Sequence, residues 1–425
     1  GTDLGLLRTK ATAQQDGSYH IQGDKIFISG GDHDLTENII HLVLARVPGS
    51  AKGVKGISLF VVPKFLPKPD GSLGPRNSSI CTGLEKKMGL KSSATCSMHF
   101  EGATGFLVGQ ENAGVRIMFS MMNVMRNTVA GQAVSLADIA YQNAHQYCKE
   151  RLQGRTPGSA TPPDQADSII DIPDVRRMLL ASKSFIEGGR ALTLWLGMQL
   201  DIAEKASDPQ ARDTAQNLLA LLIPVAKGFL TETAEYSISM SLQCYGGHGY
   251  ITETGIEQIY RDARISKIYE GATGVQAMDL LGRKVLRDKG HALGQFLTGV
   301  KAHINICKVH DTLKPFANAL SLALADLEHV TEWLIEHSGD SALPGAASHH
   351  YLELMGLVAS AYMWSLMALT AKQQLDDGLG NAQFLKAKLA TGRFYMAQYL
   401  PDTHSLVEKI KCSADIVMAH DSNIF

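Results

Sequence analysis

The sequence has no excess of charge of either sign. Its 425 residues include 40 lysines and arginines against 42 aspartates and glutamates, a formal net charge of -2. A chain with this balance has no long-range field that would draw it to nucleic acid or to an anionic membrane. Because 45% of the residues are hydrophobic, the chain can bury a large core, and its length predicts two or three domains.

Cysteine is scarce and scattered. The six cysteines form no C-x-x-C pair and no cluster with histidine at metal-ligand spacing, so we expect no metal site. A scatter of this kind favours a reducing compartment, and we expect a cytoplasmic, bacterial protein. The six are Cys81, Cys96, Cys148, Cys244, Cys307 and Cys412.

Long apolar runs are missing as well. The closest, LLALLIPVA at residues 218–226, is short and is followed by Lys227. We therefore expect no membrane span. The first residues, GTDLGLLRTKA, contain neither an initiator methionine nor a signal peptide, and we interpret the chain as truncated at its N-terminus.

A dinucleotide fingerprint is also absent. The GGHG run at residues 246–249 lacks the G-x-G-x-x-G spacing after a strand, so a Rossmann site is not indicated. Taken alone, such a run is more typical of a tight turn than of a phosphate cradle.

The first part of the chain has the pattern of antiparallel strands. From about residue 16 to 108, SYHIQGDKIFISGG contains two β-rich runs about Gly23-Asp24, and IIHLVLARV, ISLFVVPKF and ATCSMHFEG follow. The loop PKPDGSLGPRNSS has the turn formers of a solvent-facing excursion. We predict a β domain over residues 1–110.

The rest of the chain has helical spacing. Residues 111–289 contain three long segments with apolar residues three and four apart, which predict an antiparallel bundle. Residues 290–425 are again helical and amphipathic, and their acidic residues outnumber the basic ones, which argues against a nucleic-acid arm. The predicted fold class is α+β, with a β domain, a helical bundle and an additional C-terminal helical domain.

One carboxylate stands in an unusual place. In KIYEGATG, residues 267–274, Glu270 lies between a tyrosine and a glycine-containing turn at the end of a helical segment. Most glutamates at helix ends are solvated charges. The alternative is a catalytic base, and the surrounding residues decide between the two.

Three segments occur together and in order: GTDLG at residues 1–5, KIFISGG at 25–31, and QCYGGHGYITE leading to IYRDARISKIYEGATGVQ at 243–276. They resemble the end of the T-E-P-x-x-G-[ST]-D motif, the K-x-[WF]-I-[TS]-x-[GA] strand, and the Q-x-x-G-G-x-G-[YF] and R-D-x-R-x-x-x-I-Y-E-G-T signature of the acyl-CoA dehydrogenase family. The resemblance covers residues 1 to about 288. The C-terminal part resembles the larger branch of the family, which includes the methylmercaptopropionyl-CoA dehydrogenases.

The resemblance implies an FAD enzyme of fatty acid β-oxidation. Such an enzyme oxidises an acyl-CoA thioester to the trans-2-enoyl-CoA and passes the electrons to an electron-transfer flavoprotein. Removing a proton α to a thioester needs a base, and a carboxylate in a dry pocket suits that task. Glu270 is the candidate. Some members of the family carry the base at the position of Met125, and methionine cannot act as one.

The resemblance also assigns the cofactor contacts. Phe27, Ile28 and Ser29 look like the strand that packs against the isoalloxazine, although they could be ordinary strand residues. Arg151, Gln243, Gly246 and Gly247 look like contacts to the adenine half of FAD in a neighbouring subunit, which implies a homodimer or tetramer. Ala272 and Gly274 complete the set; Ala272 replaces a family threonine, and Thr273 is expected to compensate for the lost hydroxyl.

The substrate contacts follow from the same resemblance. Thr2 resembles a hydroxyl residue near both cofactor diphosphate and substrate. Asn123 and Arg126 resemble the pair near the CoA moiety, although a helix arginine is more often a solvated or paired charge. Tyr269 and Gly271 are assigned to the acyl pocket, and a buried core tyrosine is an equal alternative for Tyr269. An acyl-CoA oxidase, a DNA-binding relative and a non-catalytic subunit remain as alternative functions.

We expect this 425-residue chain to bind FAD weakly or not at all, because the N-terminal helical domain and the T-E-P portion of the first motif precede its first residue in the family. The complete protein is expected to be yellow. An absorbance spectrum of the purified chain tests this expectation, and a stoichiometric flavin spectrum would contradict it.

Overall fold

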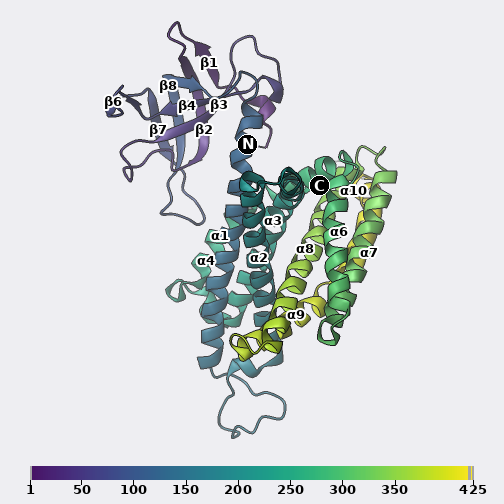
Figure 1. The fold of residues 1–425 in the computed structure, drawn as a ribbon. Helices are drawn as coiled ribbons and strands as arrows, with labels where there is room; N and C mark the ends of the chain where they lie inside the picture. The colour runs from purple at the N-terminus through teal and green to yellow at the C-terminus, as the bar shows by residue number, and fades with distance from the viewer. Residues whose placement is uncertain (1, 420–422, 424–425) are drawn as a thin grey trace. The chain divides into compact units, whose positions relative to one another are not determined.

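The computed structural model describes residues 2–419 and residue 423. The chain divides into two compact units, Gly1–Val124 and Met125–Phe425. The predicted order of an antiparallel β domain, a helical bundle and further C-terminal helices is confirmed (Figure 1). The division at residues 289 and 290 remains a prediction from the sequence.

The first unit is built on a six-stranded antiparallel sheet. The strand order is β1-β2-β8-β4-β3, and β7 also pairs with β8. A separate two-stranded ribbon, β5 with β6, forms the excursion predicted for the proline- and glycine-rich loop. The strands are β1 (Lys10–Ala13), β2 (Tyr19–Ser29), β3 (Ile40–Ala45), β4 (Ser58–Pro63), β5 (Phe65–Pro67), β6 (Leu73–Arg76), β7 (Ser79–Leu84) and β8 (Thr95–Leu107).

The two β-rich runs about Gly23-Asp24 form one continuous strand, β2. Both halves pair with the same long strand, β8, and Gly23 lies opposite Phe100. Gly23 has a φ of +136° and lies against Thr9, where an added Cβ would approach the Thr9 Cα atom to 3.2 Å. The glycine here permits close approach of two backbones, and the ladder with β8 carries the strand through it.

The second unit is helical, and its first helix starts in the first unit. Proline at the first turn opens α2 and α3, where its missing N–H has no helical acceptor to lose. The helices are α1 (Gly114–Glu150), α2 (Pro173–Lys205), α3 (Pro209–Cys244), α4 (Ile256–Ala263), α5 (Thr273–Met278), α6 (His291–Lys308), α7 (Lys314–Glu336), α8 (Leu343–Asp376), α9 (Ala382–Gln398) and α10 (Asp402–Met418). A π-helix, η7 (Asp279–Leu286), continues α5.

One hydrophobic core joins helices from both halves of the second unit. It contains buried residues of α1, α2 and α3 together with those of α6 to α10. Glycines let the helices approach closely: a Cβ on Gly188 of α2 would lie 2.9 Å from the Trp364 Nε1 atom of α8. That Nε1 atom donates to the Ser184 carbonyl over 3.0 Å, so the fully buried Trp364 also has its polar atom satisfied.

Two helices, α3 and α8, are long and apolar enough to cross a membrane by length and composition. In each, 72% of the apolar window is buried inside the protein. Their hydrophobic residues therefore face other helices, as in the central helices of a bundle.

Gly356 of α8 provides a test of this packing, because a Cβ built there would overlap the Phe229 ring of α3. Gly356→Ala is expected to lower the free energy of unfolding by about 1–3 kcal/mol through overpacking. Gly345→Ala on the same helix is the control, since a Cβ atom added there would meet no neighbouring residue within 4 Å. Urea denaturation followed by circular dichroism measures both, and equal midpoints for the two variants would contradict the packing.

Candidate active site

Glu270 lies in a short turn between the 3₁₀ helix η6 (Arg264–Lys267) and α5. Its backbone φ is +54° and that of Gly271 is +93°, so two consecutive residues occupy the left-handed region. For a residue other than glycine this conformation costs on the order of 1 kcal/mol and persists only where the surroundings hold it. The half-buried Glu270 is therefore placed by its neighbours.

Gln276 supports the turn from α5. Its side chain is fully buried, and its Nε2 atom donates to the Glu270 carbonyl oxygen over 3.4 Å. A Cβ on Gly271 would overlap that Nε2 atom. Position 271 therefore requires glycine both for its φ and for space.

Lys227 reaches the same turn from the middle of α3. Its side chain is 0% exposed, and its Nζ atom donates to the Gly271 carbonyl oxygen over 2.5 Å. Burial lowers the pKa of Lys227 from 10.5 to about 8, and the charge of Arg126 lowers it further, while the carboxylates of Glu270 and Glu232 oppose the shift.

Arg126 lies on α1 and is 5% exposed. Burial lowers the pKa of Arg126, whereas the carboxylates of Asp279 and Glu270 act in the opposite direction. One predicted substrate residue thus lies within range of the charge of the predicted base. Asn123 lies one turn earlier on the same helix, in the first unit.

Tyr269 ties the turn to α1, because its hydroxyl donates to the Gln132 Oε1 atom. Burial raises the pKa of Tyr269, and the neighbouring Glu270 adds to this effect. The ring is half-buried. Its role in an acyl pocket and its role as a core residue both remain predictions.

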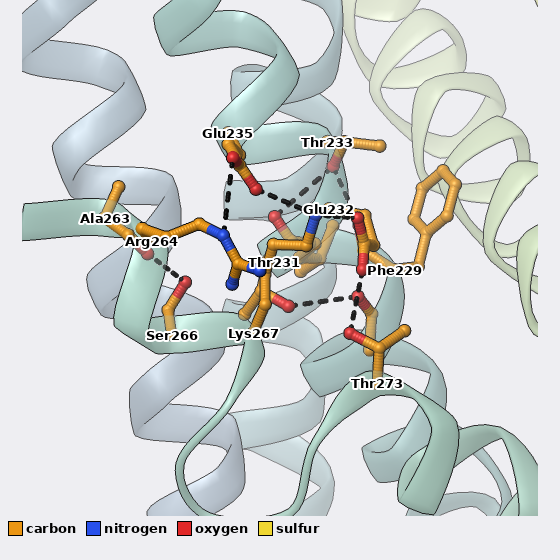
Figure 2. A network of polar contacts seen from close by, with 12 residues as sticks. Phe229, Thr231, Glu232, Thr233, Glu235, Ala263, Arg264, Ser266, Lys267 and Thr273 are labelled. Carbon is orange, nitrogen blue, oxygen red and sulfur yellow. Dashed lines mark hydrogen bonds and ion pairs between the residues drawn. The ribbon is translucent and has the colours of Figure 1, made fainter. Parts of the chain in front are cut away.

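A network of ion pairs flanks the turn (Figure 2). The Lys267 Nζ atom pairs with Glu232 and lies 2.8 Å from the Glu235 Oε2 atom. The other carboxylate oxygen of Glu235, Oε1, lies 3.8 Å from the Arg264 Nε atom. Burial alone would lower the pKa of Lys267, but hydrogen bonds and charges of the two glutamates hold it above its usual value. The network fixes η6, which leads into the turn, on α3.

Ala272 and Gly274 flank the start of α5. Ala272 is the N-cap residue and provides no side-chain hydrogen bond to the helix, and Gly274 is exposed. The Thr273 hydroxyl, which is expected to compensate for the one missing at Ala272, donates to the Glu232 Oε1 atom over 2.8 Å. That hydroxyl proton is therefore directed to α3.

The predicted adenine contacts of the second unit lie together. Arg151 follows the last residue of α1, Gln243 is in the last turn of α3, and Gly246 and Gly247 begin the 3₁₀ helix η4 (Gly246–Tyr250). All four are exposed. Added Cβ atoms on the two glycines would meet no described atom within 4 Å, so their backbone is open to a ligand.

Aromatic stacking joins these two helix ends. The rings of Tyr147 and Tyr245 are 4.2 Å apart between centroids and nearly parallel. Cys148 and Cys244 are buried in the same small hydrophobic cluster. The ends of α1 and α3, which carry the predicted adenine contacts, are therefore packed against each other.

The first unit contains the remaining predicted residues. Phe27 has a φ of +59° and is 69% exposed, at an irregularity in β2 between Lys25 and Ile28. Ile28 packs against the core of the sheet, and Ser29 is exposed beside its partner Thr95 on β8. Thr2 is exposed ahead of the 3₁₀ helix η1 (Leu4–Leu6). The irregularity thus turns a large aromatic ring outward.

The sequence reasoning missed two residues that contact the turn, Lys227 and Gln276. A signal for Lys227 was present, because it follows the most apolar run of the chain within a helix. A charge in such a position is buried and must be compensated. Within residues 2–419 and 423, no cluster of three or more His, Cys, Asp or Glu residues could hold a metal ion.

Two stretches of the chain match known families. Residues 112–286 match the family described as acyl-CoA dehydrogenase, C-terminal domain, and residues 296–421 match the one described as acetyl-CoA dehydrogenase C-terminal like. Over 98% of its length the chain is 44% identical to 3-methylmercaptopropionyl-CoA dehydrogenase of Ruegeria pomeroyi, and the match covers 69% of that relative.

Solved structures share the fold. Caenorhabditis elegans ACDH-11 in complex with C11-CoA matches with a TM-score of 0.79 at 23% identity, over 99% of this chain and 67% of that one. The acyl-CoA dehydrogenase complexed with FAD from Bacillus anthracis matches with a TM-score of 0.76 at 18% identity, over 100% of this chain and 68% of that one.

Lys267→Met is expected to lower the free energy of unfolding by about 1–3 kcal/mol, because Glu232 and Glu235 would lose their shared cation. Lys205→Met, which breaks an exposed pair with Asp201, should leave the free energy of unfolding nearly unchanged. Since the folded pKa of Lys267 is raised, its contribution is complete below the ordinary lysine pKa and is lost as pH rises through the raised value. Urea denaturation at neutral pH measures both variants, and equal losses would contradict the role of the network.

Proposed function

The chain belongs to the acyl-CoA dehydrogenase family, and on this premise we propose that the protein oxidises an acyl-CoA thioester between its α and β carbons to the trans-2-enoyl-CoA. FAD is the proposed cofactor, and an electron-transfer flavoprotein is the proposed acceptor of the electrons. The family membership supports the reaction class. The FAD bound to the Bacillus anthracis acyl-CoA dehydrogenase supports the choice of cofactor.

One observation carries the proposal: a half-buried carboxylate stands on a left-handed turn that buried side chains hold. Glu270 contributes the carboxylate, and the donors on the carbonyls of the turn are Lys227 and Gln276. A general base must keep a defined position relative to the proton that it removes. A solvated glutamate at a helix end would need no such support.

The residues of the site divide the chemistry between them. The Glu270 carboxylate accepts the proton from the α carbon of the thioester, and its own backbone N–H stabilises the charge that develops on the thioester oxygen. When bound, FAD would accept the hydride that leaves the β carbon. Arg126, buried and within range of the charge of Glu270, would interact with the CoA moiety.

The residues that would hold FAD fit the group in two respects. An exposed Phe27 ring on β2 is available for stacking, and the open backbone at Gly246 and Gly247 allows close approach of a ligand. The isoalloxazine side would be held by Phe27, Ile28 and Ser29, with Thr2, Ala272 and Gly274 near the cofactor, and the adenine half by Arg151, Gln243, Gly246 and Gly247 of a neighbouring subunit. A homodimer or tetramer belongs to the proposal.

The acyl group is proposed to be short and unbranched, because the relative at 44% identity is named for 3-methylmercaptopropionyl-CoA. Asn123, Tyr269 and Gly271 are proposed to contact the substrate.

All six cysteines are free, which agrees with the proposed cytoplasmic location.

Glu270→Gln in the FAD-loaded, full-length protein is expected to slow reduction of the flavin by acyl-CoA by at least about 100-fold, because the amide cannot accept the α proton. Glu253→Gln, an exposed glutamate of the same segment, is the matched control and should leave the rate unchanged. Anaerobic stopped-flow bleaching of the flavin measures the rate. Reduction of the Glu270→Gln variant at the unaltered rate would overturn the proposal and favour a non-catalytic protein.

A further inference from the structure

Lys227 is the least exposed cation that the structure describes. Among the described lysines and arginines its exposure of 0% is the lowest, followed by Arg126 at 5%. Burying an ammonium group costs several kcal/mol unless other groups compensate, and an apolar side chain of similar volume avoids that cost. A lysine at this point of α3 therefore needs a use that methionine could not fulfil.

The contacts of Lys227 indicate what that use is. Its Nζ atom donates to the carbonyl oxygen of Gly271, which directly follows Glu270. Gln276, also fully buried, donates to the carbonyl oxygen of Glu270. The two consecutive carbonyls of the turn are thus both held from inside the bundle.

The direction of a side chain depends on the backbone that carries it. If Glu270 relaxed from its φ of +54° into the right-handed or extended region, its Cβ atom and both carbonyls would change direction together. The hydrogen bonds to Lys227 and Gln276 oppose that relaxation, because they require the carbonyls where they are.

We propose that Lys227 is a positioning residue for Glu270: its amine holds the Gly271 carbonyl and so keeps the Glu270 carboxylate in the orientation needed to take the α proton. This inference rests on the proposed function. It assigns a role to a residue of α3 that does not itself touch the reacting atoms.

The charge of Lys227 makes the role dependent on pH. The charged groups that interact with it are Arg126 from α1, Glu232 from α3 itself and Glu270 from the turn; α8 also packs on α3, and its Glu353 interacts with Glu232. The pKa of Lys227 is about 8, so the ammonium loses its proton as pH rises through that value. A neutral amine donates a weaker hydrogen bond, and the turn is held less firmly above this pH.

Rate and stability should then change in opposite directions. Because the folded pKa of Lys227 lies below the unfolded value of 10.5, the unfolded chain binds more protons between these two values, and the contribution of Lys227 to stability rises with pH in that window. The rate of proton abstraction, in contrast, should fall as pH passes about 8.

The test uses the FAD-loaded, full-length protein and compares Lys227→Met, Lys227→Arg and Ser237→Ala. Ser237 is a buried residue of α3 whose hydroxyl donates to the Thr233 carbonyl of the same helix, which makes it a matched control. Lys227→Met is expected to lower kcat for flavin reduction by roughly 10- to 100-fold, because a small misplacement of a reacting group has an effect of this size. The KM for acyl-CoA should change by less than about 2-fold, since Lys227 contributes to positioning and not to uniform binding.

Two further measurements separate positioning from folding. Backbone amide hydrogen exchange at residues 270–272 should be faster in Lys227→Met and unchanged in Ser237→Ala. The pH profile of kcat should show a fall near pH 8 in the unaltered protein, and Lys227→Arg should retain the rate and lose that fall, because arginine stays protonated.

The outcomes distinguish this inference from the proposed function. Full activity of Glu270→Gln would overturn both. Loss of activity in Glu270→Gln together with an unaltered kcat in Lys227→Met would overturn the positioning role alone. If Lys227→Met does not fold, a pH profile of the unaltered protein without a transition near 8 overturns it.

Discussion

The left-handed turn at Glu270 and Gly271 is the constraint on which the candidate site depends. A short segment between two short helices cannot maintain such a backbone by itself, because local sterics favour other conformations. The support comes from Lys227 and Gln276, two fully buried side chains on separate helices. The position of one carboxylate is thus determined by the packing of the bundle behind it.

Burying those donors requires a bundle that excludes water, and α3 and α8 form its centre. Glycines at their contacts allow large aromatic rings to fill the space between helices. The ion pairs of Lys267 with Glu232 and Glu235 then attach η6 to the surface of α3. The ion pairs of Lys267 hold the start of the segment, and the hydrogen bonds of Lys227 and Gln276 hold the turn that follows it.

Much of the fold could be predicted from the sequence, because long apolar periodicity at three and four residues has only one common solution. The strand through Gly23 could not, since its partner, β8, lies far away in the chain and nothing local indicates the pairing. Glu270 was identified from its motif. Lys227 and Gln276 were missed because their importance arises from contacts across helices.

The fit between Gly188 and Trp364, and that between Gly356 and Phe229, connects the last helices of the chain to the earlier ones. Removing α8 would leave hollows along α2 and α3 that water or new side chains would have to fill. The C-terminal helices are therefore part of the same core as the helices that precede them. A chain without them would need a different, polar surface on α2 and α3 in order to remain folded.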